Sequence, residues 1–149
     1  MSSLTRAELL SFLRHHRYAV QSSVSPQGTP QAAVVGVAIT DRFEVVFDTL
    51  ETSRKAQNLR ANPAVALTFG SLAADAARTV QMEGRAVQAT GPDRERLITA
   101  YLEVFPDGVE RQDWTGLVYF CVTPSWLRYS DFSVMPPLVE EWDLGTNPT

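Results

Sequence analysis

The stretch Val46-Phe-Asp-Thr-Leu-Glu-Thr-Ser-Arg-Lys-Ala-Gln-Asn-Leu-Arg-Ala-Asn-Pro-Ala-Val-Ala-Leu67 decides the fold, because it joins two strands through a short helix. Residues 43–48 place an apolar side chain at every second position, which predicts a strand. Thr52 or Ser53 can cap the helix, which ends before the proline. Residues 64–69 then have the pattern of a second strand. The sequence therefore predicts a short capped helix inserted between two strands.

Working outward, three strands are expected in the first third of the chain. They cover residues 18–24, 31–40 and 43–48, and Ser25-Pro-Gln-Gly28 supplies a turn between the first two. The connections between these strands are only a few residues long, whereas a parallel pair needs a crossover of a dozen or more residues. We therefore expect antiparallel neighbours, and a Rossmann-like arrangement is disfavoured.

Further elements are expected towards both ends. Thr5 and Glu8 have capping-box spacing and predict a helix to about Arg17. A strand is expected at 79–88 with a bend or bulge at Gly84, and a helix from Gly91-Pro92-Asp93 to the stop at Pro106. The last strand is expected from Leu117 towards Phe132, interrupted by Pro124, and a mobile tail follows from about residue 136. Six or so strands with inserted helices result. Nothing in the pattern marks a domain boundary, so residues 1–149 are expected to form one domain.

Composition narrows the classes of partner. The net charge is −4 and the pI is about 5.1, which argues against general binding to nucleic acid or anionic membranes. The longest apolar run, residues 32–39, is too short to cross a bilayer, and residues 1–8 have no apolar signal core. The single cysteine, Cys121, cannot form an intramolecular disulfide and lies in an apolar run. We expect a cytoplasmic protein with a small-molecule partner.

The first turn of the short helix carries two cations. Ser53 is followed by Arg54 and Lys55, although the helix dipole disfavours positive charge at this end and the backbone leaves N–H groups without partners. A phosphate would satisfy these amides, the nearby hydroxyls and both cations. The alternative is a solvated helix start whose charges pair with Glu51 or another acid. From spacing alone both interpretations stay open.

Residues 46–67 also resemble the pyridoxamine 5′-phosphate oxidase-like, FMN-binding split-barrel family. In that family a strand ending in Thr is followed by Ser-Arg-Lys at a helix start, then by Asn-Pro and a strand, and the same order occurs here. Weaker similarities lie in Ser25-Pro-Gln-Gly-Thr-Pro30, at Gly84 and in Val122-Thr-Pro-Ser-Trp-Leu-Arg128. The resemblance implies a mainly β fold with flanking helices, a six-stranded antiparallel split β-barrel.

The resemblance also implies the site. Thr49, Ser53, Arg54 and Lys55 match residues that hold the FMN phosphate and ribityl chain. Residues 79–81 match a strand that reaches the flavin from the neighbouring subunit, so the resemblance implies a homodimer with the cofactor at its interface. The matching residues in that strand are Thr79, Val80 and Gln81. A looser match, Trp126, Arg128, Tyr129 and Ser130, corresponds to the strand that borders the flavin ring.

The sequence departs from the family pattern at three places. Asp48 stands where the oxidases place an aromatic residue, and we expect its carboxylate either to face away from the phosphate or to pair with Arg54 or Lys55. Ala33 and Val34 occupy the strand position of a phosphate-binding arginine. The chain also ends without a basic C-terminal segment for a substrate phosphate. Vitamin B6 oxidation is therefore not expected.

Three functional hypotheses follow. The first is an FMN-dependent oxidoreductase that transfers a hydride or electrons from a donor such as NAD(P)H to a small-molecule acceptor, with no catalytic acid or base identified. The second replaces FMN by a deazaflavin coenzyme, whose longer tail could use Arg54, Lys55 and Arg60. The third is a non-catalytic flavin- or haem-binding stress-response module. A haem ligand would come from His15, His16, Cys121 or a methionine.

Other chemistries lack their motifs. His15 and His16 have no Asp, Glu or Cys cluster beside them, so a metal site is not expected and both are expected at the surface. The sequence contains no Gly-x-Ser-x-Gly, Walker or dinucleotide-binding glycine pattern, which disfavours hydrolase and kinase functions. Trp114, Trp126 and Trp142 could stack on a flavin, but tryptophans more often pack in cores and interfaces.

Overall fold

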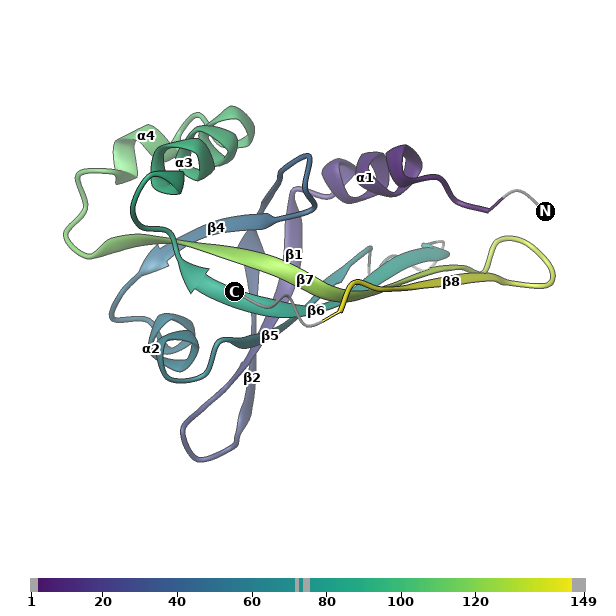
Figure 1. The fold of residues 1–149 in the computed structure, drawn as a ribbon, viewed down its shortest axis with the longest axis horizontal. Helices are drawn as coiled ribbons and strands as arrows, with labels where there is room; N and C mark the ends of the chain where they lie inside the picture. Colours follow the sequence, from purple (N-terminus) through teal and green to yellow (C-terminus); the bar gives the residue numbers. More distant parts are fainter. Residues whose placement is uncertain (1–2, 72, 74–75, 146–149) are drawn as a thin grey trace.

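The computed structural model describes residues 3–71, 73 and 76–145 (Figure 1). The helices are α1 (Arg6–His15), α2 (Arg54–Ala61), α3 (Asp93–Val104) and α4 (Gly108–Arg111). The strands are β1 (Tyr18–Val24), β2 (Pro30–Gly36), β3 (Ala38–Ile39), β4 (Val45–Leu50), β5 (Ala64–Phe69), β6 (Arg78–Gln88), β7 (Leu117–Asp131) and β8 (Leu138–Asp143). In Figure 1, α3, α4 and α1 lie along the upper side of the sheet, whereas α2 lies below it.

One curled antiparallel sheet forms the body of the molecule. Its strand order is β2-β1-β5-β6-β7-β4-β3, and β8 pairs with β7. The two ends of this order, β2 and β3, are separated in the chain by Val37 alone, so the sheet curls back on itself. The expected antiparallel split barrel is confirmed. The described residues contain eight strands, two more than the six expected, because residues 31–40 divide at Val37 and β8 is added.

The long strand β7 serves two different neighbours. Its first part pairs with β4 as far as Val122, and its last part pairs with β8 from Trp126 onward. Pro124 lies between these two pairings, so its missing N–H removes no ladder bond on that side. Opposite, the register shifts between Glu83 and Gly84, which confirms the expected bulge. A Cβ at Gly84 would lie 2.5 Å from the Thr123 carbonyl oxygen, so only glycine fits there.

Apolar side chains fill both sides of the sheet. The inner cluster contains Phe47, Phe69 and Phe120, all essentially without exposed surface. A second cluster lies between the outer face of β4 and β7 and helix α3, where Val46 packs with Tyr101. Alternation along β4 explains this division, because successive side chains point to opposite faces. Helix α2 lies near β1 and β6, at an end of the inner cluster.

Local signals place the helices as expected. Thr5 and Glu8 form the capping box of α1, with both reciprocal bonds present. Ser53 caps α2, and its hydroxyl accepts a hydrogen bond from the Ala56 amide. Within the tail expected to be mobile from about residue 136, residues 138–143 form β8 along β7. Residues 146–149 of that tail lie outside the described part of the chain.

Candidate functional site at the start of helix α2

A hydroxyl pair organises the start of α2. The Thr49 Oγ1 and Ser53 Oγ atoms are 2.9 Å apart, and Ser53 Oγ also accepts a hydrogen bond of 3.2 Å from the Ala56 amide. The amides of Arg54 and Lys55 precede the first intrahelical bonds, and no side chain of the described residues accepts from them. The last residues of β4 and the cap of α2 are thereby tied together, and two donors remain available.

A pocket of about 400 Å³ opens beside this helix start. It lies between α2 and the hairpin formed by β1 and β2, which projects past α2 in Figure 1. Its walls are Gln21, Ser23, Thr29, Pro30, Gln31, Ala32, Ala33, Arg54 and Lys55. Two cations and several amides or hydroxyls thus line it, and none of these residues is acidic. Thr49 and Ser53 lie outside the lining.

The two cations of the pocket have no carboxylate partner among the residues that the structure describes. Among the described residues, no ion pair involves Arg54 or Lys55. Glu51, which could have neutralised them, lies 3.5 Å from Arg60 instead. Arg54 Nε donates to Gln31 Oε1 at 3.1 Å, which holds the guanidinium against the pocket wall. The helix start therefore presents uncompensated positive charge to the pocket.

An amide network supports the back of the pocket. The buried Asn58 donates through Nδ2 to Ser23 Oγ at 3.1 Å and to Gln31 Oε1 at 2.9 Å. Gln21 lies on the same inward face of β1 as Ser23 and is only 1 % exposed, yet its Nε2 has no hydrogen-bond partner. Sequence reasoning missed these amides. The usable signal was the two-residue period of β1, which puts Gln21 on the inward face with Ala19.

Asp48 points away from the pocket. Its carboxylate accepts hydrogen bonds from Tyr101 Oη at 3.0 Å and from Arg111 Nε at 3.1 Å, on the side of the sheet covered by α3 and α4. Burial, and then the charge of Asp48, raises the pKa of Tyr101 well above its ordinary value, so the phenol stays protonated as a donor. The expectation that Asp48 pairs with Arg54 or Lys55 is wrong, and the alternative that it faces away holds.

The structure separates the β6 residues from the pocket. Val80 is fully buried in the inner core, so its side chain is closed to a cofactor within one protomer. Thr79 and the exposed Gln81 point to the other face of the sheet. Gln81 lies in a row that runs across Thr68, Val20 and Val34. The expected contact of Thr79 and Gln81 with the flavin of a neighbouring subunit stays a prediction.

The looser match on β7 has local partners. Arg128 forms an ion pair with Glu141 of β8, and its guanidinium lies 5.6 Å from the Trp126 ring centroid. Ser130 and Tyr129 are buried in the sheet. Of the two positions that replace the family arginine, Ala33 lines the pocket, whereas Val34 is 69 % exposed on the outer face. An arginine at residue 33 would therefore be the one to reach the pocket.

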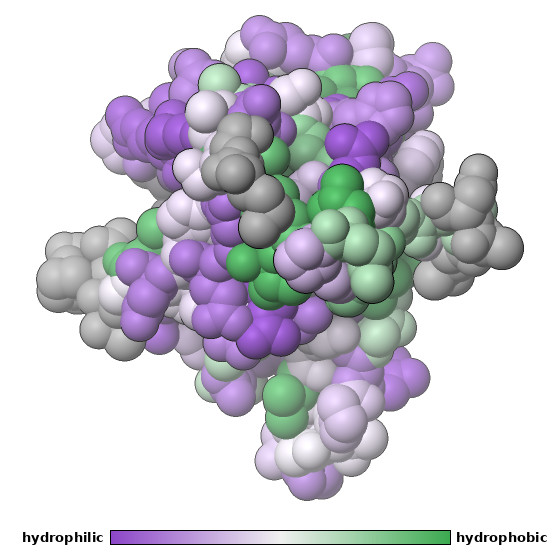
Figure 2. All heavy atoms as spheres, turned by 90° about the vertical axis from the view of Figure 1, so that its right-hand side faces the viewer, coloured by the Kyte–Doolittle hydropathy of each residue, from purple (hydrophilic) through white to green (hydrophobic). Residues whose placement is uncertain are grey.

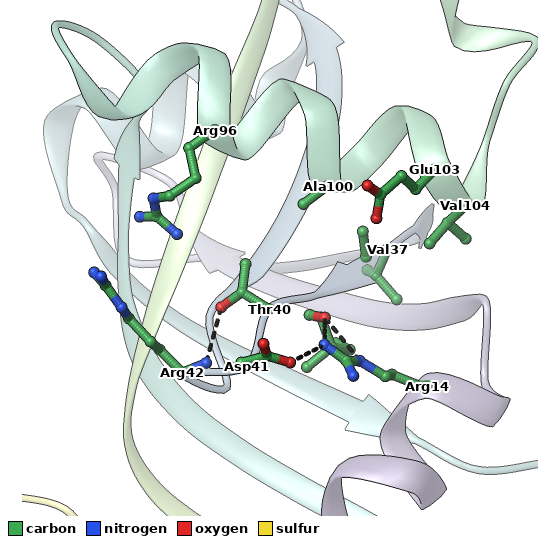
Figure 3. Close-up of a pocket in the computed structure, with 11 residues that line it drawn as sticks. Arg14, Val37, Thr40, Asp41, Arg42, Arg96, Ala100, Glu103 and Val104 are labelled. Carbon is green, nitrogen blue, oxygen red and sulfur yellow. Dashed lines mark hydrogen bonds and ion pairs between the residues drawn. The ribbon is translucent and has the colours of Figure 1, made fainter.

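A second pocket of about 640 Å³ lies beneath α3 (Figure 3). Arg14 reaches it from α1, and Arg96 reaches it from α3. Arg14 pairs with Asp41 at 2.8 Å, and Arg96 forms two bonds with Glu44, of 2.8 and 3.2 Å. Arg42 and Glu103 complete its charged lining. This pocket contains its own counter-charges.

Glu44 also affects the pKa of the Cys121 thiol. Its carboxylate accepts from Arg96 and from Thr40, and the Arg96 bonds hold the pKa of Glu44 below its ordinary value. Cys121 Sγ lies 3.6 Å from Glu44 Oε2, and burial together with this carboxylate raises the pKa of the thiol to about 12. A thiol with so high a pKa is a poor nucleophile at neutral pH. The expected packing role of Cys121 agrees with this environment.

A third pocket, of about 830 Å³, is lined in part by His15, His16, Arg78 and Tyr129. His16 Nδ1 lies 2.9 Å from the Phe12 carbonyl oxygen. Because a carbonyl can only accept, this contact requires a proton on Nδ1 if it is a hydrogen bond. His15 is exposed and His16 is half-buried. The described residues contain no group of three His, Cys, Asp or Glu placed to hold a metal ion.

Apolar residues are exposed at the turn between β7 and β8. Phe132 and Met135 are 61 % and 88 % exposed, and Val134 in the turn and Val139 in β8 are also exposed. Figure 2 faces the side on which this turn lies and shows apolar patches in green among polar surface in purple. No described helix is long and apolar enough to span a membrane.

The curled antiparallel sheet, with α2 and its capped start at one end, defines the split-barrel class. The model of the pyridoxamine 5′-phosphate oxidase family matches residues 5–131, so the chain belongs to that family. No curated protein matches the sequence. The suspected family is therefore confirmed, whereas the cofactor and the reaction are separate questions.

Solved structures share this fold at low identity. A haem-binding protein from Mycobacterium smegmatis superposes with a TM-score of 0.80 at 13% identity, over 96% of this chain and 60% of that one. The haem storage protein HutZ from Vibrio cholerae gives 0.72 at 17%, over 83% and 91%. General Stress Protein 26 from Bacillus anthracis gives 0.68 at 17%, over 92% and 98%. The chain thus spans three-fifths of the length of the first protein.

Proposed function

We propose that this protein is a cytoplasmic FMN-dependent oxidoreductase that binds the FMN phosphate at the start of α2. The observation that carries the proposal is the acid-free pocket into which Arg54 and Lys55 project. Two uncompensated cations beside unpaired first-turn amides favour a dianion. The donor set also fits a phosphate chemically, since both cationic groups form charge-assisted hydrogen bonds with phosphate oxygens.

The division of labour follows from this placement. Bound FMN would supply hydride or electron transfer between a reduced donor, such as NAD(P)H, and a small-molecule acceptor. The protein's own residues would anchor the phosphate through Arg54 and Lys55 of the pocket. The Thr49 and Ser53 hydroxyls, which lie outside the pocket lining and 2.9 Å from each other, are assigned to the adjoining ribityl chain. Neither Asp48 nor Cys121 is available for proton transfer here, because each is engaged on the other side of the sheet.

The proposal includes a homodimer. Val20 and Val34 are exposed cross-strand neighbours on the outer face of β1 and β2, in the same row as Gln81. Burial of such apolar side chains favours association. A second copy that covers this face would bring Thr79 and Gln81 towards the partner's cofactor. Measurement of the molar mass in solution tests this part, and a monomer at micromolar concentration would contradict it.

The position of Arg60 argues against the deazaflavin alternative. It counted on Arg60 as a third cation, but Arg60 is engaged by Gln88 at 2.9 Å and by Glu51. Arg60 does not line the pocket. FMN, whose phosphate needs fewer cations, therefore remains the first choice, and direct competition between the two coenzymes would decide.

Haem is a second candidate ligand, at a different place. His16 lines the pocket that contains Arg78, and its Nδ1 lies 2.9 Å from the Phe12 carbonyl oxygen, which leaves Nε2 as the ring nitrogen for a ligand bond. Imidazole is a common axial ligand, and an arginine suits a haem propionate. Two structural neighbours are described as haem-binding or haem storage proteins. Titration with haemin should give a Soret shift that His16→Ala abolishes and His15→Ala retains, and a shift retained in both variants would contradict this site.

The principal test uses the wild-type protein and two ligands. FMN should bind, and NADH or NADPH without oxygen should bleach its absorbance. Arg54→Ala should weaken FMN about ten- to a hundredfold, because one charge-assisted bond contributes about 1.5–3 kcal/mol. Riboflavin, which lacks the phosphate, is the matched control and should be unaffected. Equal losses for FMN and riboflavin would show that Arg54 acts through folding, and no FMN binding would overturn the proposal.

A further inference from the structure

Gln21 is a buried polar residue whose amide nitrogen lacks a hydrogen-bond partner among the described residues. It occupies an inward position of β1, it is 1 % exposed, and it borders the pocket beside α2. Its Nε2 has no hydrogen-bond partner among the described residues. An unpaired primary amide in a barrel interior destabilises the free protein, and a valine or methionine would pack there without that cost. The position of this amide therefore calls for a ligand that completes it.

Other polar side chains of the pocket wall are bonded to one another and not to Gln21. Gln31 Oε1 accepts from both Arg54 Nε, at 3.1 Å, and Asn58 Nδ2, at 2.9 Å. Ser23 Oγ accepts from Asn58 as well. These bonds also fix the side chains of Gln31 and Asn58 as part of the pocket wall. Gln21 itself lines this pocket, so a ligand seated there is the partner that its amide group can meet.

We propose that Gln21 donates a hydrogen bond to a phosphoryl oxygen of the ligand held by Arg54 and Lys55. All three residues line the same pocket. Arg54 and Lys55 reach it from the start of α2, and Gln21 reaches it from β1. Gln21 thus recognises the oxygen that faces the barrel, while the cations neutralise the charge. The inference rests on the proposed phosphate site and adds an uncharged specificity residue to it.

The test exploits opposite effects on stability and binding. Gln21→Met keeps the length of the side chain and removes the donor. Without ligand, Q21M should melt roughly 2–4 °C above wild type, because the unpaired amide is gone. Its affinity for FMN should fall about tenfold, whereas its affinity for riboflavin should stay within about twofold. Gln27→Met, in the exposed turn of the hairpin, is the matched control and should change none of these values.

The outcomes separate this inference from the proposed function. FMN affinity unchanged in folded Q21M, or an equal loss for FMN and riboflavin, would overturn the role of Gln21 and leave the flavin proposal standing. If wild type does not bind FMN, the flavin proposal fails, and inorganic phosphate decides the role of Gln21. Phosphate should then raise the melting temperature of wild type more than that of Q21M, and equal shifts would overturn the inference. Gln21→Val replaces Q21M should the methionine variant not fold.

Discussion

The pocket beside α2 and the pocket beneath α3 are both lined by arginine, and only the first is suited to an anion. Beneath α3, Arg14 pairs with Asp41 (Figure 3) and Arg96 pairs with Glu44, so carboxylates of the protein engage two of the three arginines that line the pocket. Beside α2, Arg54 and Lys55 face amides and alanines. A count of basic residues would not separate the two pockets. What separates them is that acidic residues line the pocket beneath α3 and carboxylates pair with two of its arginines, whereas no acidic residue lines the pocket beside α2.

The largest expected effect comes from adding a carboxylate to each pocket. Ala33→Glu places an acid beside Arg54 and should weaken FMN by at least about a hundredfold, since charges about 4 Å apart interact by about 4 kcal/mol at an effective dielectric of 20. Ala100→Glu makes the same change in the pocket beneath α3 and should leave FMN affinity unaltered. Fluorescence titration of both variants measures the affinity for FMN, and similar losses in the two variants would show that the pockets do not differ in this respect.

The reverse change of charge at the same residue should strengthen FMN binding. Ala33→Arg adds a third cation to the α2 pocket and should tighten FMN by about tenfold, because a charge-assisted hydrogen bond is partly offset by the ordering of a long side chain. Val34→Arg, whose side chain would lie on the outer face, is the control. Isothermal titration calorimetry with FMN is the measurement. An equal gain from both variants would point to general electrostatic attraction.

The smallest expected effects are on stability, in the pocket beneath α3. Glu44→Gln removes the charge that Arg96 and Thr40 bind, and should lower the free energy of unfolding by about 1–3 kcal/mol at neutral pH. Since the folded-state pKa of Glu44 is lowered, its contribution is complete above the unfolded-state value of about 4.3 and is lost as pH falls through the folded-state value.

Urea denaturation of wild type and Glu44→Gln checks this prediction. The difference between the two proteins should shrink as the pH is lowered below about 4. Asp41→Asn, at an ion pair whose aspartate is 88 % exposed, is the control and should cost less than about 0.5 kcal/mol. A difference that persists unchanged in acid would show that Glu44 acts through packing.

Much of the fold could be predicted because its signals are local. Ser53 caps α2 through its own hydroxyl, and Gly84 marks a bulge that no Cβ would allow. The cations of the site were equally visible, since Arg54 and Lys55 follow the cap directly. Each of these features depends on residues close in sequence or on a single backbone requirement.

The remaining features depend on distant partners. The Asp48 carboxylate accepts a hydrogen bond from Arg111, which lies sixty-three positions later, so no spacing rule could have paired the two residues. Residues 138–143 form a strand only because the end of β7 offers an edge beyond Pro124. Gln21 resembles an ordinary surface glutamine until the curl of the sheet encloses it. The burial of a polar residue is decided by the closed sheet, which a local pattern does not contain.

Strand β8 has a consequence for how copies of the protein meet. An outermost strand offers unpaired amides and carbonyls to which another chain could add, with aggregation as the result. Glu140, Glu141 and Asp143 give half of the six residues of β8 a negative charge. Two such strands approaching side by side would repel each other. Uncontrolled strand addition is thereby discouraged at this margin, and orderly association is left to the broad faces of the sheet.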